Sequence, residues 1–120
     1  MQRIPVSVYA EVTPNPSTMK FVANKLLIDN GQTYEYTDPD GRVDSPLAMR
    51  LFNFPFVDAV FMSKNFVTLT KNDKVEDWQD VMAELREYIT EYIAMGNPVL
   101  KENAQSVSKS ETGIPQSQET

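Results

Sequence analysis

The sequence predicts an α+β domain in which a largely antiparallel sheet of about five strands carries two helices on one face, in the order β-β-β-α-β-β-α. Three observations lead to this prediction. Apolar residues alternate along residues 6–12, which is the two-residue period of a half-buried strand. The Ser-Pro pair at residues 45–46 has the form of a helix start. Apolar residues then recur at helical spacing between residues 75 and 93.

The first half of the chain contains three predicted strands. The alternating strand ends at the Pro-Asn-Pro sequence of residues 14–16, because proline lacks a backbone donor and disfavours the helical region for the residue before it. A second strand is predicted over residues 20–28 and a third over residues 33–37. The Asp-Asn-Gly sequence at residues 29–31 is a strong hairpin signal and predicts that these two strands pair.

The first helix is predicted to begin at Ser45 and Pro46. The serine hydroxyl can cap a free backbone N–H, and proline at the first helical position loses no hydrogen bond. Leu51 and Phe52 belong to a short apolar face of this helix, which Pro55 ends.

Residues 56–62 and 66–71 are predicted to be strands that form a hairpin through residues 63–65, and Phe66 with the neighbouring phenylalanines is expected to pack against the first helix. The last helix is expected to start in a capping box formed by Asp73 and Glu76. The helical spacing of Trp78 and Leu85 predicts that both are core residues, and Gly96 stops the helix.

The chain is predicted to consist of an α+β domain over residues 1–97 and a flexible polar tail or linker over residues 98–120. Fifteen of the last 20 residues are Ser, Thr, Gln, Asn, Glu or Lys. Such a segment buries too little apolar surface to offset the entropy of ordering it.

Composition excludes several functions. The net charge of −6 argues against nucleic acid and against an anionic membrane surface, because both are bound through clustered Lys and Arg. The chain has no Cys and no His, so it lacks the ligands of zinc, haem and iron–sulfur sites and the nucleophile–histidine pairs of hydrolases. No pair of carboxylates has a recognisable acid–base context. The sequence therefore predicts a protein that is not an enzyme and that binds no cofactor or metal.

Two acidic features have ordinary interpretations. The Asp38 to Gly41 segment lacks the first ligand and the bidentate glutamate of a calcium loop, since Tyr36 and Leu47 occupy those positions. The carboxylates of the last helix are expected to form a solvated face, with a basic partner as the alternative. Met1 is followed directly by the first strand, with no room for a signal peptide and no apolar run of membrane-spanning length, so a cytoplasmic location is expected.

A set of short runs carries a resemblance to a known family. These runs are Thr-Pro-Asn-Pro-Ser-Thr-Met-Lys-Phe at 13–21, Ser-Pro-Leu-Ala-Met-Arg-Leu-Phe at 45–52, and Phe-Val-Thr-Leu-Thr-Lys at 66–71, followed by Trp78. In this order they resemble the N-terminal domain of the Nfu family of NifU-like iron–sulfur scaffold proteins, over about residues 4–93. The resemblance implies an accessory, partner-binding domain whose partners are proteins of iron–sulfur cluster assembly or a Cys-x-x-Cys domain. In that family the cysteine pair belongs to a separate C-terminal domain.

The candidate partner-binding residues are Thr13, Pro14, Asn15, Pro16 and Lys20. A loop restricted by two prolines loses little entropy on binding, which suits a docking surface. The alternative is a turn that only sets the angle between two strands. The alternative function is a stand-alone protein-interaction module of the same fold with no direct link to clusters.

Overall fold

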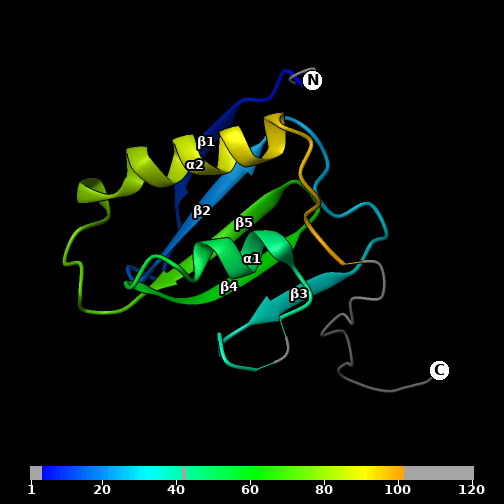
Figure 1. The fold of residues 1–120 in the computed structure, drawn as a ribbon. Helices are drawn as coiled ribbons and strands as arrows, with labels where there is room; N and C mark the ends of the chain where they lie inside the picture. Colours follow the sequence, from blue (N-terminus) through cyan, green and yellow to red (C-terminus); the bar gives the residue numbers. More distant parts are fainter. Residues whose placement is uncertain (1–3, 42, 102–120) are drawn as a thin grey trace.

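The computed structural model describes residues 4–41 and 43–101, which form one antiparallel sheet and the helices that cover it (Figure 1). The elements, in chain order, are β1 (Val8–Val12), β2 (Thr18–Ala23), β3 (Thr33–Tyr36), α1 (Pro46–Leu51), β4 (Val57–Ser63), β5 (Phe66–Lys71), the short 3₁₀ helix η1 (Trp78–Asp80) and α2 (Met82–Ala94).

The five strands lie in the order β1-β2-β5-β4-β3, and every neighbouring pair is antiparallel. Figure 1 shows both helices on the same face of the sheet, with α2 beside β1 and β2 and α1 beside β4. The predicted fold class is confirmed. Neither helix in the described part of the chain is long and apolar enough to cross a bilayer.

The predicted pairing of the second and third strands is wrong. β2 ends at Ala23 and is paired on both sides, with β1 and with β5, whereas β3 pairs with β4 at the far edge of the sheet. The chain between them crosses the end of the sheet, where the N–H groups of Leu27 and Ile28 both donate to the carbonyl of Lys64, at 2.7 and 2.8 Å. Both edges of β2 are therefore occupied, and residues 29–31 form a local turn in this crossing segment.

The predicted hairpin of β4 and β5 is confirmed. Ser63 pairs with Phe66, so Lys64 and Asn65 alone make the turn. Lys64 has a φ of 48°, as tight hairpin turns require at a central position.

The two helices begin in different ways. Ser45 caps α1 as predicted, since its Oγ accepts a hydrogen bond from the N–H of Ala48 at 3.0 Å. The predicted capping box at Asp73 is wrong. The chain first forms η1, capped by Asp77, whose Oδ1 accepts from the N–H of Gln79, and α2 then starts at Met82 without a side-chain cap. The turn of η1 lies where Trp78 enters the core, which is the physical reason that the regular helix starts later than its apolar spacing suggests.

The core lies between the helices and the sheet. Both helices and the three central strands contribute side chains that are at most 1% exposed: Phe21, Leu47, Leu51, Val60, Met62, Val67, Leu69, Leu85 and Ile89. Each such side chain contributes about 1.5–3 kcal/mol of transfer free energy. Gly96, with φ +78°, follows the end of α2 as predicted.

Residues 98–101, which were predicted to belong to the flexible tail, are held against the domain. The hydroxyl of Tyr92 donates to the carbonyl of Pro98 at 2.7 Å, and the N–H of Lys101 donates to the carbonyl of Asp44 at 2.7 Å. Ser45 Oγ also donates to the carbonyl of Val99. Residues 98–101 thus pack with the domain, and the remainder of the predicted tail, residues 102–120, lies outside the described residues.

Ser45 serves two segments, so its replacement should be costly. Ser45→Ala removes the cap of α1 and leaves the Val99 carbonyl without its buried donor, and we expect the free energy of unfolding to fall by about 1–3 kcal/mol. Urea denaturation followed by circular dichroism measures this. Ser7→Ala, at an exposed serine, is the matched control and should change stability by less than about 0.5 kcal/mol. Equal stabilities for the two variants would contradict the double role of Ser45.

Candidate functional site

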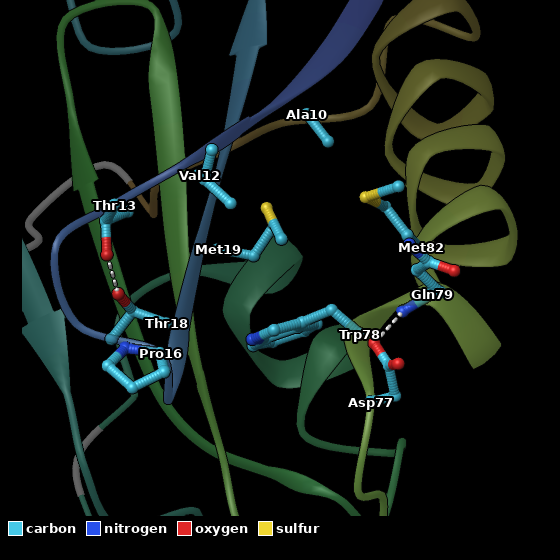
Figure 2. Close-up of a pocket in the computed structure, with 10 residues that line it drawn as sticks. All are labelled: Ala10, Val12, Thr13, Pro16, Thr18, Met19, Asp77, Trp78, Gln79 and Met82. Atoms are coloured by element: carbon cyan, nitrogen blue, oxygen red, sulfur yellow. Dashed lines mark hydrogen bonds between the residues drawn. The ribbon is translucent and has the colours of Figure 1, made fainter.

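A pocket of about 400 Å³ lies between the β1–β2 turn and the start of α2 (Figure 2). One wall comes from the two strands and their turn and consists of Ala10, Val12, Thr13, Pro16, Thr18 and Met19. The other wall comes from η1 and the first residue of α2 and consists of Asp77, Trp78, Gln79 and Met82. The pocket, called the Trp78 pocket below, is where two segments about 60 residues apart in the sequence meet.

Trp78 lies between the two walls. Its side chain is buried, at 6% exposed, and Met19 beside it is 5% exposed. In Figure 2 the nitrogen end of the indole points toward the side of the pocket formed by Pro16 and Thr18. The indole Nε1 is buried and has no hydrogen-bond partner in the described part of the chain. A buried donor without an acceptor costs about 1–3 kcal/mol, so this N–H offsets part of the stability that the buried ring contributes.

The β1–β2 turn forms one rim of the pocket and is held by its own hydrogen bonds. The Thr13 hydroxyl accepts from the N–H of Asn15 at 3.0 Å, and the Asn15 side-chain carbonyl accepts from the N–H of Ser17 at 2.9 Å. The hydroxyls of Thr13 and Thr18 bond to each other across the turn. These bonds and the two prolines give the rim a fixed shape.

The structure divides the predicted partner-binding residues. Thr13 and Pro16 line the pocket, while Pro14 and Asn15 are exposed at the tip of the turn and do not line it. Lys20 lies on the opposite face of the sheet.

The direction of Lys20 follows from the pleat of β2. Met19 and Phe21 point to the core, so the residue between them points away. The Lys20 Nζ lies 4.2 Å from the ring centroid of Phe66 and 3.8 Å from a carboxylate oxygen of Glu11. Lys20 therefore stabilises the open face of the sheet and is not part of the same site as Thr13.

The residues predicted to be structural have different environments. Ser45, Leu51, Trp78 and Leu85 are buried. Pro46 is the first residue of α1, and it and Phe52 are half-buried.

The expectation that Phe66 packs against the first helix is wrong. It is half-buried and lies on the open face of the sheet, with its ring centroid 6.1 Å from that of Phe61. Val67 and Leu69 point to the other face of β5, and they are the residues that reach the core.

Sequence reasoning missed most of the pocket. Val12 was expected to face the core, but it is 81% exposed at the end of β1, where it lines the pocket. Met82 was read only as a core residue of the last helix, and it is half-buried on the opposite wall. One feature of the sequence could have indicated the pocket: the apolar strand residue Val12 stands directly before the turn of residues 13–16, which is polar and contains two prolines.

The charge beside the pocket is negative. Residues 73–80 contain four carboxylates, all exposed, and one lysine. Asp77 lines the pocket itself. Across residues 4–41 and 43–101, no three acidic, His or Cys side chains are grouped as a metal site. The pocket offers apolar walls and a carboxylate at the rim, which suits an apolar side chain with a positive charge close to it.

Comparison with known proteins identifies relatives of the whole domain. The family model described as the N-terminal part of the scaffold protein Nfu/NifU matches residues 8–96. The human protein named NFU1 iron-sulfur cluster scaffold homolog, mitochondrial, is 32% identical over 94 residues, which cover 78% of this chain and 37% of that protein. A NifU-like protein of Schizosaccharomyces pombe is 35% identical over 94 residues, covering 78% of this chain and 36% of that protein. The chain thus spans only about a third of the length of these relatives.

Two solved structures share the fold. A NifU-like protein from Saccharomyces cerevisiae matches with a TM-score of 0.70 at 22% identity, covering 82% of this chain and 87% of that one. Protein SAV1430 from Staphylococcus aureus matches with a TM-score of 0.53 at 20% identity, covering 74% of this chain and 99% of that one. Several relatives are named as mitochondrial proteins, and the cytoplasmic location expected for this chain stays a prediction.

The turn is expected to depend on Asn15 for its stability. Asn15→Ala removes the acceptor of the Ser17 N–H, and we expect a loss of about 0.5–1.5 kcal/mol in the free energy of unfolding with no change in the affinity for a protein partner. Asn15→Asp keeps an acceptor at the same position and serves as the control. Weaker partner binding at unchanged melting temperature would show instead that the Asn15 amide contacts the partner.

Trp78 is expected to contribute strongly to stability because it connects η1 to the sheet. Trp78→Ala should lower the free energy of unfolding by about 3–5 kcal/mol, a large part of the total for a domain of this size. Trp78→Phe keeps most of the buried area while removing the unpaired Nε1 donor, so it should cost less than the alanine variant. Thermal denaturation compares the two, and an alanine variant that melts like the wild type would contradict the core assignment.

Proposed function

Because this chain belongs to the Nfu/NifU scaffold family, whose N-terminal domain it matches over residues 8–96, we propose that it is a non-catalytic, partner-binding domain of iron–sulfur cluster assembly that does not ligate a cluster itself. One observation carries the proposal: a chain from a cluster-scaffold family contains no cysteine and no histidine. Protein-bound clusters are held by cysteine thiolates, with histidine as the main substitute.

The ligands must then come from another protein or domain. The cluster is cargo in such a process, and the thiolates that hold it belong to a Cys-x-x-Cys domain or to another assembly protein. The contribution of this chain is to bind that partner and to position it.

The Trp78 pocket supports a binding role. Its rim is held rigid by the hydrogen bonds of the β1–β2 turn, so little conformational entropy is lost when a partner docks there. Its walls combine the exposed Val12 with the half-buried Ala10 and Met82, above the buried Trp78 ring. Surfaces of this composition, an apolar centre with a polar rim, are those on which proteins bind other proteins.

The proposal predicts two results with purified protein. After anaerobic reconstitution with iron and sulfide, the chain alone should stay colourless, while a Cys-x-x-Cys domain from a Nfu-family protein should acquire the visible charge-transfer absorption of a cluster. The two should also form a complex, measured by isothermal titration calorimetry with the cluster-loaded and the cluster-free domain.

Each half of the proposal can fail separately. A stable visible band on the chain alone, at stoichiometric iron, would contradict the non-ligating role. Absence of binding to the cysteine-bearing domain and to other cluster-assembly proteins would contradict the assembly role and favour an interaction module unconnected to clusters.

A further inference from the structure

β1 is an edge strand, and its unpaired side can be identified from the hydrogen-bonding register. The N–H of Asn24 donates to the carbonyl of Ser7, which makes these two a hydrogen-bonded pair. Hydrogen-bonded and non-hydrogen-bonded pairs alternate along an antiparallel ladder. In the register that pairs Val8 with Ala23, the backbone groups of Val8, Ala10 and Val12 therefore point away from β2.

The other edge of β2 gives an independent check. The N–H groups of Ala23 and Lys71 bond to the carbonyls of Asn65 and Ser17 across the β2–β5 ladder. The backbone groups of the odd-numbered residues of β2 thus face β5, and those of the even-numbered residues face β1. This agrees with the β1–β2 register, in which the backbone groups of Ser7 and its alternate neighbours in β1 face β2. No strand in the described part of the chain pairs with the outer side of β1.

The free edge leads into the Trp78 pocket. Ala10 and Val12, whose backbone groups face outward, also line the pocket with their side chains. A further strand beside β1 would send alternate side chains to that same face, within cross-strand reach of Val12. An apolar side chain there would meet Met82 and the Trp78 indole, whose Nε1 has no acceptor.

The charges indicate which kind of strand fits. Asp73, Glu76, Asp77 and Asp80 are all exposed on the segment that forms the pocket's second wall. A segment carrying Lys or Arg two residues from its apolar residue, and so on the same face of the strand, would be attracted to them. A second copy of this chain would bring the same four carboxylates and a net charge of −6 to the interface, where like charges repel.

We propose that the β1 edge and the Trp78 pocket together form a docking groove for an extended, basic and apolar segment of a partner protein, which adds to the sheet as a sixth strand. This inference rests on the proposed function, which it makes specific. The partner's backbone pairs with Ala10 and Val12, one apolar side chain enters the pocket, and a cation two residues along the strand, on the same face, lies near Asp77.

The probe is a blocked seven-residue peptide of sequence Thr-Lys-Thr-Val-Thr-Lys-Thr, in which the valine and both lysines point to the same face of a strand. It is compared with a peptide that has glutamate in place of both lysines. Binding is followed by two-dimensional amide NMR of the full chain. Trp78 is the only tryptophan, so its indole N–H gives one assignable signal. We expect the lysine peptide to shift that signal and the amide signals of Ala10 and Val12, and the glutamate peptide to leave them in place.

Matched variants separate the edge from the pocket. Val12→Pro removes one outward N–H, and the fold tolerates this at an edge position because β2 does not bond to that group. The variant should lower the affinity for the lysine peptide at least about tenfold. Val12→Thr keeps both the N–H and the branched shape and should bind within about threefold of the wild type. Asp77→Asn keeps an acceptor for the N–H of Gln79 and should lower the affinity for the lysine peptide severalfold at low salt.

Several results would overturn the groove. The first is that the Trp78, Ala10 and Val12 signals do not move at saturating peptide. The second is that Val12→Pro binds the lysine peptide with wild-type affinity. The third is a wild-type dimer that Val12→Pro converts to a monomer, because the occupant of the groove would then be a second copy of the chain. If a cluster-assembly protein binds Val12→Pro as tightly as the wild type, the proposed function stands and the groove fails. If the peptide occupies the groove but no assembly protein binds the chain, the groove stands and the proposed function fails.

Discussion

β2 forms two antiparallel ladders, one with β1 and one with β5, and this double pairing determines where the other elements lie. With both its edges occupied, the chain that follows Ala23 has to cross the end of the sheet, where the Lys64 carbonyl receives the N–H groups of Leu27 and Ile28. β3 pairs with β4, at the far edge of the sheet. The same arrangement leaves β1 as an edge with backbone groups facing outward.

The Trp78 side chain connects the core to the proposed binding surface. Its ring is buried between the sheet and the start of α2, so it contributes to the stability of the fold. Its Nε1 has no acceptor, which offsets part of that gain.

The distribution of charge is consistent with a protein that binds other proteins. The carboxylates of residues 73–80 lie beside an apolar pocket, whereas Lys20 is held on the opposite face by Glu11 and Phe66. The two faces of the sheet therefore offer different surfaces. This arrangement is compatible with the proposed role of the chain as a partner-binding domain.

Local signals in the sequence determined the features that depend on a few neighbouring residues. These are the cap at Ser45, the turn between β4 and β5, the helix stop at Gly96 and the lack of cluster ligands. The tertiary structure alone decided that residues 20–28 and 33–37 do not pair and that Lys20 and Thr13 lie apart. It also formed the pocket, because Val12 and Met82 meet only after β1 and α2 pack together. Strand pairing and burial depend on which distant edges and faces are still free, and no short stretch of sequence contains that information.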